Sequence, residues 1–403
     1  MEPAATSAFV LIVLVALAVG ACASVNKTIE SDDGEVIDCV DFYQQPAFKN
    51  APAGSGEIQA KPAKSMKDMV AAANATTRQE RLQTWRRHGS CPAGTVPIRR
   101  ASPSHANLIA ELFRRSSPFG RPGNDISAAH QFGDGRRSPG SKFNSSAMAA
   151  PPGAKVEVAA AYATNGPYLG ARADVPYWKL NVHPDEFSMH YIMVGNTLNT
   201  SYKPIKGAKP PEDLTNQIVV GLVNDGGVKN NCFNLDCGGF HLKEGAPYAL
   251  ESSWRDSDSQ VGGVRYGITL GIHREPAGLN WWVSVMDQEI GYFPETVFNT
   301  RFPDAVYVEM GGRVLDTRPG GNHTTTPMGS GMPACAGSRF AASIMEYLGV
   351  ASDGTLFNDP ADRTVATTPS CYDAKPQWFG KKPVGYSVAY GGPGGIYCDH
   401  PET

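Results

Sequence analysis

Residues 280–331 read NWWVSVMDQEIGYFPETVFNTRFPDAVYVEMGGRVLDTRPGGNHTTTPMGSG, the most strongly patterned stretch of the chain. Two alternating apolar segments, 281–292 and 305–315, are separated by a Phe-Pro dipeptide and a polar connector. Alternation with a period of two is typical of strands that are buried on one face. The stretch therefore predicts two strands joined by a loop longer than a hairpin turn.

The second of these strands carries the first candidate site. Successive side chains of a strand point to opposite faces. Tyr307, Glu309 and, unless the two glycines form a bulge, Arg313 therefore share one face. A carboxylate and a guanidinium on the same face of a strand mark a place where chemistry is expected.

The composition favours strands over helices throughout the chain. The 43 Gly and 31 Pro among 403 residues work against long helices. Beyond residue 153, short β-like runs recur between turns, which predicts a mainly β sandwich or barrel. The expected strands are 155–163, 168–175, 186–194, 217–222, 239–243, 264–272 and 387–390, in addition to the two above, while 336–348 competes as a helix.

The charge of the chain limits the classes of partner that are expected. The 36 Lys and Arg and 39 Asp and Glu give a formal net charge of −3, and no extended basic run is present. Nucleic acid is therefore not an expected partner.

The N-terminus predicts export. Residues 9–19 (FVLIVLVALAV) are apolar and too short to span a bilayer comfortably, and Ala-Cys-Ala follows as a cleavage pattern at 21–23. We interpret residues 1–23 as a secretory signal peptide, with the mature protein extracellular or vacuolar and not attached to a membrane. The alternative is an uncleaved short anchor, because the segment before the apolar run has no Lys or Arg.

Two further segments precede the β-rich body, which spans residues 153–403. Residues 24–115 predict a small α+β unit, with a strand from residue 37, helix within 65–88, a strand near 96–99 and a short helix at 106–115. Residues 116–152 are rich in Gly, Ser and Pro and predict a flexible linker. Arg136-Arg137 in this linker is either a processing site or an ordinary solvated pair.

Seven cysteines remain after the signal peptide, which in an oxidising compartment predicts three disulfides and one leftover thiol. The sequence does not fix the pairing, but locality suggests Cys39 with Cys91, Cys232 with Cys237, and Cys371 with Cys398. Cys335 is then expected to be an unpaired buried thiol. A zinc knuckle at Cys232 and Cys237 is the competing interpretation, although no second ligand pair follows at finger spacing. We expect no metal and no cofactor.

Glycosylation sequons fit the same compartment. Besides Asn26, which lies close to the cleavage point, the candidates are Asn74, Asn144, Asn199 and Asn322.

Several motifs in a shared order resemble the neprosin family of plant secreted proteins, whose founding members are glutamic endopeptidases that cleave after proline. The N-terminal unit resembles the family's activation peptide through IDCVD (37–41), QPAF (45–48) and CPAGTVPIRR (91–100). The body resembles the peptidase domain through CFNLDCGGF (232–240), NWW (280–282), GYFP (291–294), MGSG (328–331) and YGGPG (390–394). The resemblance implies an antiparallel β-sandwich with two glutamates in one cleft, and a propeptide that blocks the cleft.

The chain departs from the family at both glutamates. Two facing carboxyls would share a proton, so that one acts as general acid while the other activates water. By the resemblance, the first glutamate corresponds to Lys206 and the second to Arg313. In an alternative alignment Glu309 is the retained acid, with Glu212 or Asp213 as its only available partner.

Other constellations are weaker. No HExxH, GxSxG or P-loop occurs. Trp281, Trp282 and Tyr307 are candidates to line a cleft, although aromatic area is mostly used in packing.

The sequence therefore predicts a secreted pseudopeptidase that binds a peptide or protein and its own propeptide. The cations at Lys206 and Arg313 would attract carboxylate groups. The alternative is an active zymogen that cleaves after proline at acidic pH.

Overall fold

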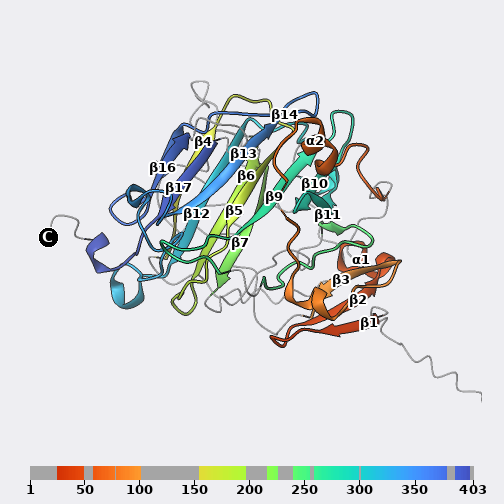
Figure 1. Cartoon of the computed structure of the whole chain (residues 1–403), viewed down its shortest axis with the longest axis horizontal. Helices are drawn as coiled ribbons and strands as arrows, with labels where there is room; N and C mark the ends of the chain where they lie inside the picture. The colour runs from red at the N-terminus through yellow and green to blue at the C-terminus, as the bar shows by residue number, and fades with distance from the viewer. Residues whose placement is uncertain are drawn as a thin grey trace, which may run out of the picture.

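The computed structural model describes residues 25–49, 58–77, 79–100, 154–196, 216–225, 239–254, 258–298, 301–378 and 386–399. Within these ranges the chain forms a mainly β protein whose paired strands are all antiparallel (Figure 1). The predicted signal peptide, the predicted linker with Arg136-Arg137, and the expected helix at 106–115 lie outside the described residues.

Two sheets form the body. The nine-stranded sheet has the order β16-β17-β13-β5-β9-β10-β11-β8, with β14 paired to β13. Its strands are β5 (Gly170–Pro176), β8 (His241–Leu242), β9 (Gly267–Arg274), β10 (Trp281–Val285), β11 (Gln288–Phe293), β13 (Ala342–Val350), β14 (Leu356–Phe357), β16 (Asp373–Trp378) and β17 (Tyr386–Gly391). The five-stranded sheet has the order β15-β4-β12-β6-β7. Its strands are β4 (Lys155–Ala163), β6 (Phe187–Gly195), β7 (Gln217–Asp225), β12 (Tyr307–Asp316) and β15 (Arg363–Ala366).

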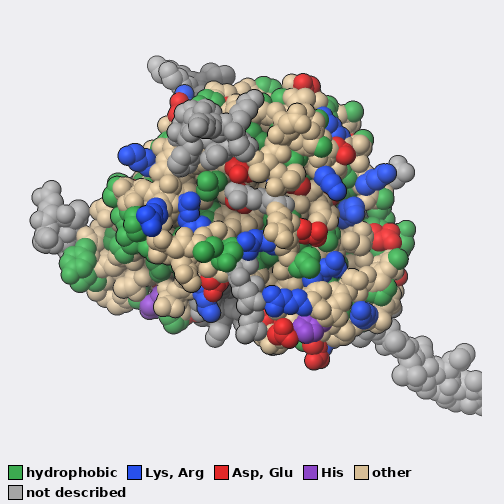
Figure 2. All heavy atoms as spheres, in the orientation of Figure 1, with side chains coloured by type: hydrophobic (Ala, Val, Ile, Leu, Met, Phe, Trp, Pro, Cys, Tyr) green, Lys and Arg blue, Asp and Glu red, His purple; other side chains and the backbone are tan. Residues whose placement is uncertain are grey.

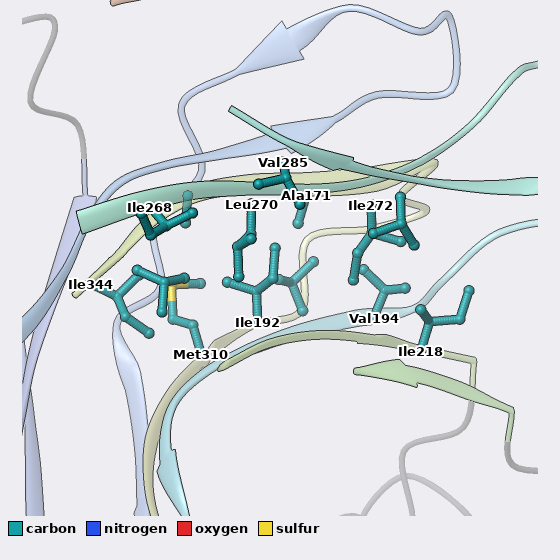
Figure 3. Packing of buried hydrophobic residues seen from close by; sticks show 14 of the residues in the cluster. Ala171, Ile192, Val194, Ile218, Ile268, Leu270, Ile272, Val285, Met310 and Ile344 are labelled. Carbon is teal, nitrogen blue, oxygen red and sulfur yellow. The ribbon is translucent and has the colours of Figure 1, made fainter. Parts of the chain in front are cut away.

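The main hydrophobic core lies between the two sheets. Figure 3 shows Ile268, Leu270 and Ile272 of β9 pointing toward Ile192 and Val194 of β6 across this space. Apolar side chains at every second position of these strands are the cause, because the period of two places them all on the inner face. The body is therefore an antiparallel β-sandwich, as predicted.

The N-terminal unit is a three-stranded sheet with short helices. The strands are β1 (Val25–Glu30), β2 (Val36–Asp41) and β3 (Thr95–Arg99), and the helices are α1 (Pro46–Lys49) and α2 (Met66–Ala72). The 3-10 helices of the described residues are η1 (Phe42–Gln44), η2 (Thr84–His88), η3 (Glu295–Val297), η4 (Pro319–Gly321), η5 (Ala334–Ala336) and η6 (Ile396–Cys398). The expected helix within 65–88 is thus limited to α2 and η2. Ser65 begins α2 with a reciprocal capping box to Asp68.

This unit packs directly on the body. Val40, Phe42 and Val96 belong to the same buried cluster as the inter-sheet core. The side chain of Gln45 is buried and pairs with the main chain of Leu242 in both directions, at 2.7 and 3.2 Å. Figure 1 shows the red and orange N-terminal segments along the β10–β11 side of the sandwich.

Two expectations about elements were wrong. Residues 281–292 form a hairpin, β10 and β11, because Met286 and Asp287 both adopt left-handed φ (51° and 61°) and so make a tight turn. Residues 336–348 were a candidate helix, yet most of them belong to strand β13. Helix-forming residues there are outweighed by pairing with β17 and β5 on both sides.

The surface has no single sign of charge. Figure 2 shows Lys and Arg side chains interspersed with Asp and Glu on the face in view, in keeping with the net charge of −3. In the part of the chain that the structure describes, no helix is both long and apolar enough to cross a membrane.

Candidate functional site

Strand β12 carries Glu309 and Arg313 on the outer face of the five-stranded sheet. Its pairing with β4 and β6 continues without a register shift through both glycines. No bulge therefore interrupts the alternation. Val308 and Met310 point into the inter-sheet core, as Figure 3 shows for Met310, so that the side chain of Glu309 lies on the opposite face.

A glycine between the two charged residues allows them to meet. Residues four apart in a strand are separated by roughly 13 Å at Cα, so both side chains must lean along the strand to touch. Gly311, on the same face between them, has no side chain to obstruct this. A Cβ at Gly311 would lie 2.3 Å from the carbonyl oxygen of Ala159 on β4, so the position requires glycine.

Glu309 and Arg313 form a buried ion pair. The distance from Arg313 Nη2 to Glu309 Oε1 is 2.8 Å, and both side chains are 0% exposed. Tyr191, which lies opposite Gly311 on β6, donates its hydroxyl to the same Glu309 oxygen. Its ring also lies beneath the guanidinium, with 4.4 Å from Arg313 Cζ to the ring centroid.

The pKa values of Tyr191 and Arg313 are both shifted upward at this buried site. Burial raises the pKa of Tyr191 well above its ordinary value, so the phenol remains a neutral donor. Burial acts to lower the pKa of Arg313, but Tyr191 and Glu309 outweigh it and the net shift is upward. The second oxygen of Glu309, Oε2, is buried and accepts no hydrogen bond from the described residues.

Two family models match the chain. The neprosin model covers residues 207–393, and the neprosin activation peptide model covers residues 28–131. The chain belongs to the neprosin family. It is therefore a peptidase-related protein with its own activation peptide. Arg313 and Glu309 lie within the neprosin match, which begins one residue after Lys206.

The other candidate site residues on this part of the chain are Lys206, Glu212, Asp213 and Tyr307. Lys206, Glu212 and Asp213 are all outside the described residues, so the structure does not place Lys206 relative to Arg313. Tyr307 does lie on the Glu309 face, where it is buried and accepts a hydrogen bond from Gln217 Nε2 at 2.7 Å.

The adjacent tryptophans Trp281 and Trp282 do not lie beside Glu309. Trp281 is fully buried in the inter-sheet core and donates its indole N–H to the carbonyl oxygen of Phe302 at 2.9 Å. Trp282 points to the other side of β10, the outer face of the nine-stranded sheet, where its ring centroid is 4.8 Å from that of Tyr292. Trp281, Trp282 and Tyr307 therefore do not share one surface, because the two sheets separate them.

The disulfides in the described residues join cysteines that are close in the sequence. Cys39 is bonded to Cys91, and Cys371 to Cys398, as predicted. Cys335 is unpaired but exposed, which corrects the expectation of a buried thiol. Cys232 and Cys237 lie outside the described residues, as do the sequons at Asn144 and Asn199. Asn74 and Asn322 are exposed, and their glycosylation stays a prediction.

A second buried polar cluster was not foreseen. His323 Nε2 lies 2.9 Å from Glu157 Oε2, and Lys155 Nζ lies 2.5 Å from the other oxygen of Glu157. Ligand atoms of Glu157, Asp316 and His323 lie within 4.8 Å of one another, close enough to hold a cation. We interpret the cluster as structural because Lys155 and His323 already neutralise the Glu157 carboxylate.

Tyr191 was also missed by sequence reasoning. The signal was present, because the alternation of FSMHYIMVG (187–195) places Tyr191 on the same side as Phe187, Met189 and Met193. Its pairing with Gly311, however, depends on the order of strands in the sheet, which the sequence does not state.

Proposed function

We propose that this neprosin-family protein is a secreted pseudopeptidase that retains the peptidase fold and its activation peptide but does not cleave peptide bonds. The proposal rests on the Arg313–Glu309 ion pair. By the motif order, Arg313 occupies the position of the second family glutamate, and it holds the nearest acid, Glu309, in a buried pair at 2.8 Å.

This geometry places a guanidinium beside Glu309, where the two-carboxyl mechanism needs a second carboxyl. A carboxyl that acts as general acid must keep its proton, which a like-charged neighbour favours and a guanidinium opposes. Glu309 Oε1 already receives hydrogen bonds from Arg313 and Tyr191. A water molecule at that oxygen would have to displace both donors.

The same pair changes the expected ligand. A free arginine would attract carboxylate groups, but the charge of Arg313 is balanced by Glu309. We therefore propose a peptide ligand recognised by its shape and main chain, without a requirement for acidic residues. Secretion through the signal peptide is part of the same proposal.

One observation favours an active zymogen as the second candidate. The chain retains an activation peptide match at residues 28–131, which a protein without activity would not need for inhibition. In that case Glu309 would be a catalytic acid after activation, and the Arg313 pair would belong to the inactive precursor.

Restoring the two glutamates tests the proposal. The variant carries Lys206→Glu and Arg313→Glu, together with Glu309→Gln so that the new carboxylate at 313 has no anionic neighbour. The native chain and the single variants Arg313→Gln and Glu309→Gln serve as controls. Proline-containing peptides are incubated with each acid-treated protein from pH 2 to 7 and analysed by mass spectrometry. Cleavage by the restored variant alone supports the proposal, whereas cleavage by the native chain that Glu309→Gln abolishes supports the zymogen.

A further inference from the structure

The outer face of the nine-stranded sheet, on the far side of the sandwich from Glu309, is polar and aromatic although it is buried. One row of cross-strand neighbours on this face runs over four strands and consists of His273, Trp282, Tyr292 and His241. The next row consists of Gly271, Ser284 and Glu289. We call these two rows the outer groove.

A segment of the activation peptide, residues 59–66 (QAKPAKSM), lies on the outer groove and ends at Met66, the first residue of α2. Three of its main-chain amides donate to side chains of the body: Gln59 to Tyr292 Oη at 3.2 Å, Ala63 to the carboxylate of Glu275, and Met66 to Glu289 Oε1 at 2.6 Å. Asn280 Nδ2 also donates to the side-chain oxygen of Gln59 at 2.7 Å. Main-chain contacts of this kind hold a peptide without reading its sequence.

Two side chains of the segment anchor it. Pro62 and Met66 are buried, whereas Ala60, Lys61 and Ala63 are exposed. Met66 is 0% exposed and lies over Gly271, where an added Cβ would be 2.8 Å from Met66 Cε. The absence of a side chain at Gly271 therefore forms the pocket for Met66.

Some polar side chains of the outer groove receive no hydrogen-bond partner from the segment that lies on them. Ser284 Oγ and Trp282 Nε1 are buried, yet neither has a hydrogen-bond partner among the described residues. Buried polar groups of a permanent core are almost always paired, so such exceptions require an explanation. A groove that takes different peptides would leave some of its donors and acceptors unmatched by any one of them.

We propose that the outer groove is a peptide-binding site distinct from the Glu309 face, and that residues 59–66 are its built-in ligand. The ligand it fits is a peptide with a proline and, four residues later, a long unbranched apolar side chain. Carboxylates of the body accept the peptide amides. Lys61, before the first anchor, is exposed, and Lys64, between the anchors, donates from Nζ to the carbonyl oxygen of Gly354 at 2.9 Å, so basic side chains are accommodated at both positions. This site does not depend on whether Glu309 is catalytic, so its failure and that of the proposed function are separately observable.

Binding in trans tests the proposal in the full chain. The built-in segment is weakened by Pro62→Ala and Met66→Ala, and a fluorescein-labelled peptide of residues 58–67 is added while its anisotropy is measured. We expect saturable binding to this variant and none to the native chain, whose tethered segment competes at high effective concentration. Peptides with alanine at either anchor should bind about tenfold more weakly, because each loses a buried apolar side chain. A peptide with alanine at the exposed Lys61 position should bind like the parent.

A groove variant completes the test. Adding Gly271→Ala to the weakened chain fills the methionine pocket, and we expect the peptide to bind at least about tenfold more weakly. Circular dichroism establishes that each variant is folded, and the single Met66→Ala chain replaces the double variant if the latter is not. The proposal is overturned if a folded weakened chain does not bind the peptide. Equal affinity for the parent and both anchor-substituted peptides would overturn it as well.

Discussion

Arg313 Nη2 lies 2.8 Å from Glu309 Oε1 on one strand, and neither side chain is exposed to solvent. The contact depends on Gly311 between them and on Tyr191 from the neighbouring strand, which contacts both residues. In a family whose chemistry is expected to need two carboxyls, this strand instead presents one carboxylate and its countercharge.

Loss of the guanidinium should destabilise the fold. Arg313→Met leaves the Glu309 carboxylate buried without a countercharge, and we expect the free energy of unfolding to fall by about 3–5 kcal/mol. The paired variant Glu309→Met with Arg313→Met removes both charges and should be about as stable as the native chain. Urea unfolding at pH 7 measures all three. An equal loss in the single and double variants would show that packing, not charge, dominates at this site.

Gly311 should tolerate no side chain. Its Cβ would lie 2.3 Å from a carbonyl oxygen of β4, which is paired on both sides by β15 and β12, and main-chain atoms there have little freedom to move. We expect Gly311→Ala to reduce stability by about 1–3 kcal/mol. Gly263→Ala is the matched control, because its Cβ meets only the flexible Gln260. Similar melting temperatures for the two variants would contradict this account of the strand.

Stability should depend on pH through Glu157 and His323. Burial acts to raise the pKa of Glu157, but hydrogen bonds from His323 and Lys155 bring it below the ordinary value of 4.5. Burial acts to lower the pKa of His323, but Glu157 raises it above the ordinary value of 6.5. The Glu157 contribution is therefore present above pH 4.5 and is lost as pH falls through its lowered pKa. The His323 contribution is present below pH 6.5 and is lost as pH rises through its raised pKa.

His323 contributes most to stability at pH values between the lowered pKa of Glu157 and the raised pKa of His323. We expect His323→Gln to lower the free energy of unfolding most near pH 5.5, with a smaller difference near pH 3 and pH 9. Urea titrations at these three values compare the variant with the native chain. A difference that does not change with pH would mean that His323 acts through packing alone.

The exposed thiol of Cys335 should react without unfolding. We expect iodoacetamide to modify it in the native protein, and Cys335→Ser to remove that product while changing stability by less than about 0.5 kcal/mol. Intact mass spectrometry reads the modification. Failure of the native protein to react at this position would show that the thiol is covered.

Much of the fold could be predicted from local pattern. Strand β4 has the bounds expected for it, Lys155–Ala163. The hairpin turn at Met286 and Asp287 could not be predicted, since neither residue carries the glycine signal of a left-handed turn. Strand β13 was missed because its central position between β17 and β5 overrides the helical propensity of its residues.

The site could be predicted only along one strand. Period two placed Tyr307, Glu309 and Arg313 on one face, which the structure confirms. It did not separate Trp281 and Trp282 from that face, because the assignment of strands to sheets is a long-range property. Tyr191 could not be predicted for the same reason, because it contacts Glu309 only through the pairing of β6 with β12.

Peptide cleavage by the unmodified chain tests the central claim most directly. The secreted, acid-treated protein is incubated with proline-containing peptides from pH 2 to 7, and the products are identified by mass spectrometry. The claim that the Arg313–Glu309 pair has replaced a working pair of carboxyls predicts no cleavage at any pH. Cleavage after proline that disappears in Glu309→Gln, and persists in a control substituted at the remote Glu295, would contradict it.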